Sequence, residues 1–178
     1  MDNINIIKDN STLKKFCKKC INENVLAIDT EFIRENTYFP VLCLVQIASE
    51  TFSAVIDPLS EIDMKPVWEL LSNKKILKIF HAGRQDIEIF FNLFGFLPNN
   101  IFDTQIAFSF MCQEFQISYE KLVLKLLKIK LDKTFQYYDW SLRPISQNQL
   151  TYALNDVYYL RKIYFKIEQK LKSINRLH

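Results

Sequence analysis

The chain has 178 residues, of which 49% are hydrophobic and 14% aromatic, so it is large and apolar enough to bury a core without disulfides, and a disordered chain is excluded. Its 23 basic and 20 acidic residues leave a net charge of +3, which permits nucleic-acid binding without arguing for it. No apolar run approaches the roughly 20 residues that span a bilayer, and the N-terminus lacks the basic start of a signal peptide. We therefore expect a soluble protein of the cytoplasm, with no membrane contact.

The first predicted element is an amphipathic helix that Asn10 or Ser11 caps and that runs to about Ile21. Cys17 and Cys20 form a Cys-x-x-Cys pair on its apolar stripe, but no second pair and no nearby histidine completes a zinc set. We expect buried thiols and assign the cysteines no chemistry.

The next element is a strand that ends in two carboxylates. An apolar, strand-favouring run over 25–28 leads into Asp29-Thr30-Glu31-Phe32. Side chains two apart on an extended chain point to the same face, so Asp29 and Glu31 lie together. Two like charges this close repel unless a cation or a shared proton offsets the repulsion. The pair predicts a divalent metal site and directs the search for further ligands.

Two more apolar runs, over 42–48 and 52–57, follow with short connections, which predicts an antiparallel meander with the first strand. Asp57, which precedes a proline, is interpreted as a turn residue. A helix and a buried strand over 76–80 come next.

Both glycines of the chain flank the following helix. The segment His81-Ala82-Gly83 ends the strand, the helix runs from about Arg84 to Phe94, and Gly95 occupies its C′ position. Asp86 lies about one turn inside this helix, where an acid is either favoured by the helix dipole or available as a metal ligand.

Three further helices are predicted over 104–111, 118–127 and 146–171. Asp103 is expected to cap the first, and a Ser-x-x-Gln capping box marks the start of the last. Strands that come first and helices that are interleaved later indicate an α/β fold, with a mixed sheet flanked by helices on both faces.

The last helix supplies the remaining acid. Tyr152 and Asp156 are four residues apart and project from one face, beside the apolar stripe, where an acid is often a boundary residue. With Asp29, Glu31 and Asp86, however, Asp156 completes an all-oxygen set of the kind that magnesium and manganese prefer. Two such cations about 4 Å apart cleave phosphodiesters. Tyr152, a neutral phenol, would hold the attacking water.

These motifs together resemble the ribonuclease D branch of the exonuclease superfamily that is named for its four acidic residues, in the subgroup with a tyrosine in the third motif. In chain order the motifs are Asp29-Thr30-Glu31, His81-Ala82-x-x-x-Asp86, Asp103-Thr104-Gln105, Asp139-Trp140-x-x-Arg143-Pro144 and Tyr152-x-x-x-Asp156. The likeness extends from about Val25 to Leu160.

The resemblance implies a ribonuclease H-like fold with a mixed five-stranded sheet. It also implies hydrolysis of RNA, such as transfer-RNA precursors, from the 3′ end to nucleoside 5′-monophosphates. The cofactors would be two divalent ions, Mg²⁺ or Mn²⁺. Asp29, Glu31 and Asp156 would ligate the first ion, Asp29 would bridge to the second, and Asp86 would hold the second through water. Tyr152 would orient the nucleophile.

Larger ribonuclease D proteins carry helical nucleic-acid-binding domains of the HRDC type after the catalytic one. We expect residues 1–178 to be a single catalytic domain without them, either naturally short or trimmed. RNA contacts are then expected from side chains near the motifs: Thr30, Phe32, Arg34, Gln46, His81, Arg84, Lys133, Tyr137 and Tyr138. Further RNA contacts are expected from basic side chains before the last helix: Lys121, Lys125, Lys128, Lys130, Lys133 and Arg143. For the first three of these, a solvated helix face is an equally good interpretation.

Two other functions stay open. One is a short-oligonucleotide or DNA-directed exonuclease of the same superfamily, because missing accessory domains would weaken the hold on long structured RNA. The other is an inactive relative that only binds nucleic acid. The clustered acids argue against the second, since negative charge repels the phosphates that a binding surface must attract. Protein partners do not follow from the sequence.

Overall fold

The centre of the fold is a six-stranded mixed sheet. The computed structural model describes residues 6–34, 38–112 and 114–176. The strands are β1 (Ile6–Ile7), β2 (Val25–Ile33), β3 (Val41–Ala48), β4 (Ser53–Ile56), β5 (Leu77–Phe80) and β6 (Ile101–Asp103), in the spatial order β1-β4-β3-β2-β5-β6. The predicted meander is present, because β3 pairs antiparallel with both β2 and β4. β5 is parallel to β2, and β6 is parallel to β5.

The mixed α/β sheet is confirmed, whereas the expected number of five strands is wrong. The additional strand is β1, which pairs parallel to β4 at the edge of the sheet. Two residues are too few to show an alternating pattern in the sequence. The strand forms because Ile6 and Ile7 find a free edge to pair with, which is a tertiary circumstance.

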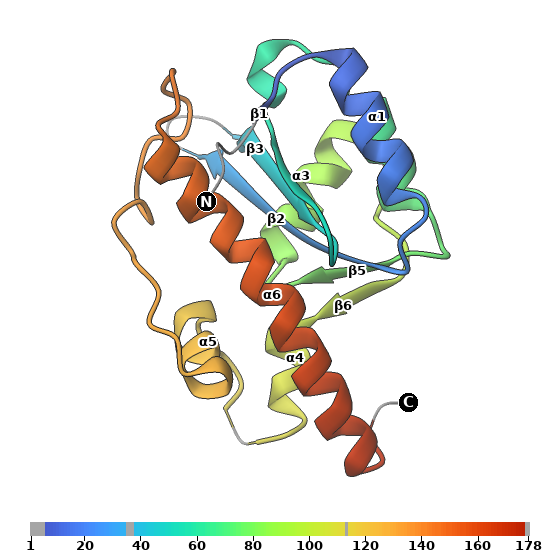
Figure 1. Ribbon diagram of the computed structural model, residues 1–178, viewed down its shortest axis with the longest axis vertical. Coiled ribbons are helices and arrows are strands. Elements are labelled where there is room, and N and C mark those ends of the chain that lie inside the picture. The colour runs from blue at the N-terminus through green and yellow to red at the C-terminus, as the bar shows by residue number, and fades with distance from the viewer. Residues whose placement is uncertain (1–5, 35–37, 113, 177–178) are drawn as a thin grey trace.

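Helices cover both faces of the sheet (Figure 1). On one face lie α1 (Asn10–Cys20), α2 (Lys65–Ser72) and α3 (Arg84–Phe94), and on the other α6 (Gln147–Ser173) crosses β2 to β5. α4 (Thr104–Ser109) and α5 (Tyr119–Leu127) pack beside the second half of α6, and a short 3₁₀ helix, η1 (Pro58–Ser60), follows β4. None of the helices in the described residues is long and apolar enough to cross a membrane.

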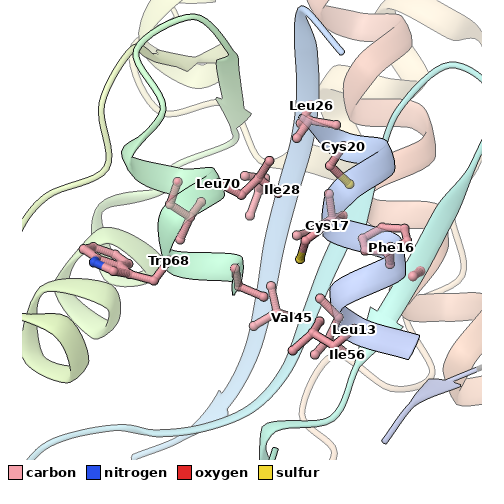
Figure 2. Close-up of a cluster of buried hydrophobic side chains, with 14 of the residues drawn as sticks. Leu13, Phe16, Cys17, Cys20, Leu26, Ile28, Val45, Ile56, Trp68 and Leu70 are labelled. Atoms are coloured by element: carbon pink, nitrogen blue, oxygen red, sulfur yellow. The ribbon is translucent and has the colours of Figure 1, made fainter. Parts of the chain in front are cut away.

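The largest core lies between the sheet and helices α1 to α3 (Figure 2). Alternate strand residues such as Leu26, Ile28 and Val45 project into it, as the period of two requires. Cys17 and Cys20 are buried in the same core, as predicted from their helical stripe. Burial raises the pKa of the Cys17 thiol to about 12, so this side chain packs as a small apolar group.

Capping side chains set the helix boundaries. α6 begins with the predicted capping box, in which Gln149 N donates to Ser146 Oγ at 3.3 Å and Ser146 N donates to Gln149 Oε1 at 2.8 Å. The cap of α1 is Asp9, rather than Asn10 or Ser11, and its carboxylate accepts a hydrogen bond of 2.9 Å from the backbone N–H three residues later. All three residue types are good caps, so the sequence leaves the choice among neighbours open.

The pairing of β2 with β3 shifts register beside the site. Glu31 lies opposite Leu44, but Phe32 lies opposite Leu42, so Cys43 has no partner on β2. At this irregularity the carbonyl of Cys43 accepts a hydrogen bond of 3.0 Å from Arg143 Nη2. Strand alternation places Glu31 on the α6 face with Asp29 and Asp156, while Phe32 packs against the opposite core.

Arg143 joins three parts of the chain just before α6. Its Nε and Nη2 donate to the Asp57 carboxylate at 2.9 and 2.6 Å, Nη1 donates to the carbonyls of Trp140 and Leu142 at 2.7 and 2.9 Å, and Nη2 also donates to Cys43 O at 3.0 Å. All five guanidinium N–H groups are thereby used. Arg143 is thus a structural residue and not the RNA contact that we expected, and Asp57 is its partner as well as the cap of η1.

Candidate active site

Three carboxylates from two elements meet on the α6 face of the sheet. Asp29 and Glu31 project from β2, and Asp156 projects from α6 where it crosses that strand. One carboxylate oxygen from each residue lies within 4.8 Å of the others. Oxygen donors at this spacing fit a hard divalent cation such as Mg²⁺ or Mn²⁺.

The fourth predicted acid approaches from the opposite side of β2. Asp86 lies in the first turn of α3, is 7% exposed, and accepts a hydrogen bond of 2.5 Å from Thr30 Oγ1. Its carboxylate is not part of the three-carboxylate group, but it is close enough to Asp29 to raise the pKa of that residue. Thr30 is buried, and its hydroxyl is engaged in fixing Asp86.

Burial raises the pKa of all four acids, and repulsion within the group adds to the effect at Asp29 and Glu31. The pKa of Asp29 lies well above its ordinary range because of burial first, and then because of the charges of Asp86, Asp156 and Glu31. Burial and the neighbouring acids raise the pKa of Glu31 to about 9. Burial raises the pKa of Asp156 to about 7 and that of Asp86 to about 6. Protons or cations must therefore neutralise the group.

These shifts predict that the metal-free protein loses stability as pH rises. Between the ordinary carboxyl pKa of 3.8 to 4.5 and the raised values of about 6 to 9, the folded protein binds more protons than the unfolded chain does. In chelator, we expect the Tm at about pH 8.5 to be about 5 °C or more below that at about pH 5.5.

Thermal unfolding at the two pH values measures this difference. Asp156→Asn removes one titrating group and is expected to narrow the difference, and Mn²⁺ is expected to narrow it in the unchanged protein, because the ion replaces protons. A metal-free Tm that is equal or higher at the alkaline pH would contradict the prediction.

Tyr152 lies one turn before Asp156 in an aromatic cage. Its ring is 5.9 Å from Phe135, at an interplanar angle of 77°, and 6.0 Å from Trp140, at 32°. Burial, together with the charges of Asp156 and the other acids, raises its pKa above the ordinary value of 10.0. The phenol is therefore neutral at physiological pH, and it can both donate and accept a hydrogen bond beside the carboxylates.

Two aromatic side chains of this region, Phe135 and Tyr119, are not among the site residues predicted from the sequence. Phe135 forms one wall of the cage around Tyr152. Tyr119, at the start of α5, donates its hydroxyl to the carbonyl of Asn155 at 3.2 Å and to that of Asp156, and so links α5 to α6 beside Asp156. Their sequence neighbourhoods give no motif that distinguishes them from core aromatics, because their roles depend on contacts with a distant helix.

Asp103 organises the turn between β5 and α3. Its carboxylate accepts hydrogen bonds from Ala82 N at 3.1 Å and Gly83 N at 2.9 Å, and it caps α4 through Gln105 N at 2.8 Å. The predicted cap is thus confirmed. At Gly83 a Cβ atom would come within 2.6 Å of the Phe80 side chain, so only glycine fits this turn.

A cavity of about 210 Å³ opens beside the carboxylates, and its wall includes Asp29, His81, Tyr119, Lys133, Tyr152 and Asp156. His81 lies with Nδ1 at 3.0 Å from Thr104 Oγ1 and Nε2 at 3.1 Å from Ile117 O. Both ring nitrogens therefore have protein partners, and burial lowers the pKa of the ring. His81 meets the cavity as a neutral, fixed ring.

A second cavity, of about 430 Å³, lies across Glu31 from the first and is lined by aromatic rings. Phe32, Tyr137, Tyr138 and Trp140 contribute to its wall, together with Arg34. Tyr137 and Tyr138 are exposed, whereas Trp140 is buried, as expected of an anchor for this loop. Aromatic faces beside a carboxylate cluster are suited to stacking on nucleic-acid bases.

Two of the predicted basic contacts, Lys133 and Arg34, line the first and the second cavity respectively. Arg34 pairs with Glu88 at 3.3 Å, and Lys133 pairs with Glu120 at 2.5 Å at the rim of the first cavity. Arg84 is exposed at the start of α3. The Arg34–Glu88 and Lys133–Glu120 ion pairs are partly exposed to solvent. Such exposed pairs are weak, so Arg34 and Lys133 remain available to bind a phosphate.

Gln46 is a further predicted RNA contact that the structure places out of reach, as it does the buried Thr30. Gln46 is 0% exposed, on β3 directly opposite Asp29. A nucleic acid has no access to this side chain, so the expectation that it contacts RNA is wrong. The sequence pattern of β3 shows a polar residue in an apolar strand but not that α6 covers it.

Comparison with known proteins places this chain in a family. Residues 4–172 match the family described as 3′-5′ exonuclease. The chain belongs to this family. Ribonuclease D of Bartonella henselae is 48% identical over 158 residues, which make up 88% of this chain and 39% of the relative. Ribonuclease D of Nitrobacter hamburgensis is 42% identical, with 97% of this chain and 46% of the relative covered. The chain spans less than half the length of these exonucleases.

Solved structures of the exonuclease family agree with the fold. RNase D of Escherichia coli has a TM-score of 0.94 and 35% identity, over 98% of this chain and 47% of its own. This match confirms the predicted ribonuclease H-like exonuclease fold. NrnC of Brucella melitensis, at 30% identity, matches with a TM-score of 0.73 in a structure with bound Mg²⁺, over 88% of this chain and 77% of its own. In a structure bound to pGG its TM-score is 0.77, over 97% and 84%.

Proposed function

We propose that this chain is a metal-dependent 3′-5′ exoribonuclease of the ribonuclease D type, which releases nucleoside 5′-monophosphates from the 3′ ends of RNA. The observation that carries the proposal is the convergence of Asp29, Glu31 and Asp156 within 4.8 Å, with Asp86 and Tyr152 beside them, in a chain of the exonuclease family. Residues 1–178 would form the catalytic domain.

The proposed cofactors are two divalent ions, Mg²⁺ or Mn²⁺. Asp29, Glu31 and Asp156 would hold the first, and Asp29 and Asp86 would hold the second. NrnC, a relative, has been solved with bound Mg²⁺. When bound, such a pair activates a water at neutral pH and stabilises the charge that develops on the leaving oxygen. The raised pKa values of the acids support the assignment, because a charge cluster of this kind requires neutralisation.

The chain's own residues position the reactants. Tyr152, held by Phe135 and Trp140, keeps its proton and orients the attacking water toward the scissile phosphate. Lys133 at the cavity rim supplies positive charge to the backbone phosphates. The aromatic cavity across Glu31 offers stacking faces to an unpaired base.

Tyr152→Phe tests this assignment of roles. The variant keeps the ring in its aromatic cage but removes the hydroxyl, so we expect kcat to fall about 100-fold because the water is no longer aligned. Mn²⁺ affinity is expected to stay as in the unchanged protein, since the phenol is not a ligand. Steady-state kinetics and titration calorimetry measure the two quantities, and a loss of metal affinity as large as that in kcat would contradict the role.

The proposed function is tested with 5′-labelled single-stranded RNA, incubated with Mn²⁺, with Mg²⁺ and with chelator. A ladder that shortens from the 3′ end, absent in chelator and with Asp156→Ala, is the expected result. RNA binding without hydrolysis under every metal condition would instead favour an inactive binding relative. E. coli RNase D is an exoribonuclease involved in structured RNA processing, so a transfer-RNA precursor is the natural second substrate.

One observation favours a second candidate function, the hydrolysis of short oligonucleotides. NrnC of Brucella melitensis, which is 30% identical to this chain, has been solved with bound pGG. Initial rates on a dinucleotide, a long single strand and a transfer-RNA precursor distinguish the two. A preference for the dinucleotide of 100-fold or more, on the order of 3 kcal/mol, would replace the first proposal with the second.

A further inference from the structure

Gln46 is a buried polar side chain that the proposed chemistry does not use. Among the described residues, neither its Nε2 nor its Oε1 has a hydrogen-bond partner, although the residue is 0% exposed. A buried amide without partners costs about 1–3 kcal/mol. Leu44 and Ala48, two residues away on β3, are buried and apolar. An apolar residue at position 46 would thus suit the core better than glutamine does.

The pairing of the strands brings Gln46 to the site. It lies directly opposite Asp29 on β2, while its partner on β4 is the apolar Val55. Directly opposed residues on antiparallel strands project to the same face, with Cβ atoms about 4.5–5.5 Å apart. The carboxamide therefore reaches the Asp29 carboxylate by rotation about its own side-chain bonds.

We propose that Gln46 is a positioning residue for Asp29, whose Nε2 donates a hydrogen bond to the Asp29 carboxylate when the site holds metal. The inference rests on the proposed function, in which Asp29 is the bridging ligand. Carboxylates that ligate metals are themselves held by hydrogen bonds from surrounding residues. Thr30 already supports Asp86 in this way, and Gln46 gives Asp29 the equivalent support from the neighbouring strand.

In this role, the burial of Gln46 lowers the stability of the metal-free protein, and its hydrogen bond to Asp29 strengthens the binding of the ion. If Gln46 served the fold alone, its replacement would lower the stability of the metal-free protein and leave the metal affinity unchanged. A positioning residue gives the opposite result: its replacement by an apolar side chain leaves the metal-free fold intact or more stable, and weakens the binding of the ion.

Gln46→Met is the decisive variant, because methionine has nearly the same length and no N–H group. We expect its metal-free Tm to equal or exceed that of the unchanged protein, and its Mn²⁺ affinity to fall about 10- to 100-fold. Titration calorimetry and the Mn²⁺-induced increase in Tm measure the affinity independently of activity. Gln46→Leu provides the same comparison should the methionine variant not fold.

Trp68→Phe is the matched control. Trp68 Nε1 is also buried without a partner among the described residues, but it lies in the core on the opposite face of the sheet. Removal of this N–H group is expected to leave Mn²⁺ affinity within about twofold of the original, far less than the change expected for a residue that supports a ligand. A control that loses as much affinity as Gln46→Met would show a general effect of core substitution and overturn the inference.

The outcomes separate this inference from the proposed function. Equal Mn²⁺ affinity in Gln46→Met and the unchanged protein, with RNA hydrolysis intact, overturns the role of Gln46 alone. An unchanged protein that neither binds Mn²⁺ nor hydrolyses RNA overturns the proposed function, and the role of Gln46 with it.

Discussion

Asp29→Asn is expected to lower the rate of RNA hydrolysis by at least about 1,000-fold, equivalent to about 4 kcal/mol, and to weaken Mn²⁺ binding. Asparagine has the shape of aspartate but carries no charge, and the charges of Glu31, Asp156 and Asp86 all act on Asp29. The loss therefore acts on both proposed ions. Single-turnover hydrolysis and Mn²⁺ titration measure the two effects.

The same substitution also predicts a gain in stability without metal. The pKa of Asp29 is raised by burial and by three neighbouring acids, so its charge is unfavourable in the folded protein. We expect the Tm of Asp29→Asn in chelator, at about pH 8, to exceed that of the unchanged protein.

Asp63→Asn provides the control for Asp29→Asn. It makes the same chemical change at an exposed site before α2, where Asp63 accepts a hydrogen bond from Lys65 N at 3.0 Å. Asparagine accepts this bond equally well, so hydrolysis is expected to be unchanged. Equal Mn²⁺ affinity in Asp29→Asn and the unchanged protein would rule out Asp29 as a ligand.

Asp57→Ala is expected to lower the free energy of unfolding by about 3–5 kcal/mol, or the Tm by about 10 °C. The side chain of Asp57 is 3% exposed and binds Arg143 through two hydrogen bonds. Its removal leaves the guanidinium without its counter-charge in a partly buried position. Urea denaturation followed by circular dichroism measures the change.

A surface ion pair gives the contrast. Glu114 and Lys125 are 2.8 Å apart, but their side chains are 43% and 52% exposed. Glu114→Ala is expected to change the free energy of unfolding by less than about 1 kcal/mol, because solvent screens the pair. If Asp57→Ala lowers the free energy of unfolding by no more than Glu114→Ala does, the Asp57–Arg143 ion pair does not hold the start of α6. Other contacts must then position Tyr152.

The two predictions describe opposite uses of charge in one domain. Asp57 has a cation with matched geometry, so its burial stabilises the fold. Asp29 has acidic neighbours, so its burial destabilises the metal-free fold and favours a bound cation. Asp57 holds the loop that leads into α6. Asp29 lies on β2, which α6 crosses with Tyr152 and Asp156.

The sequence determined the features that depend on local geometry. The spacing of Asp29 and Glu31 placed two carboxylates on one face, because strand side chains alternate. The capping box at Ser146 and Gln149 located the start of α6, and Gly95 located the end of α3, because hydrogen bonds within one turn define both. The motif resemblance added the family, which the comparisons confirmed.

Only the tertiary structure decided which distant residues meet. Strand β1 forms because β4 offers a free edge, and Arg143 serves the fold because Asp57 lies beside it. The burial of Gln46 follows from the packing of α6 over β3, which no pattern within β3 records. Local rules fix which way a side chain points along its own element. What the side chain then contacts depends on elements far away in the chain. The free energy of their packing depends on all of these elements together and cannot be inferred from one segment.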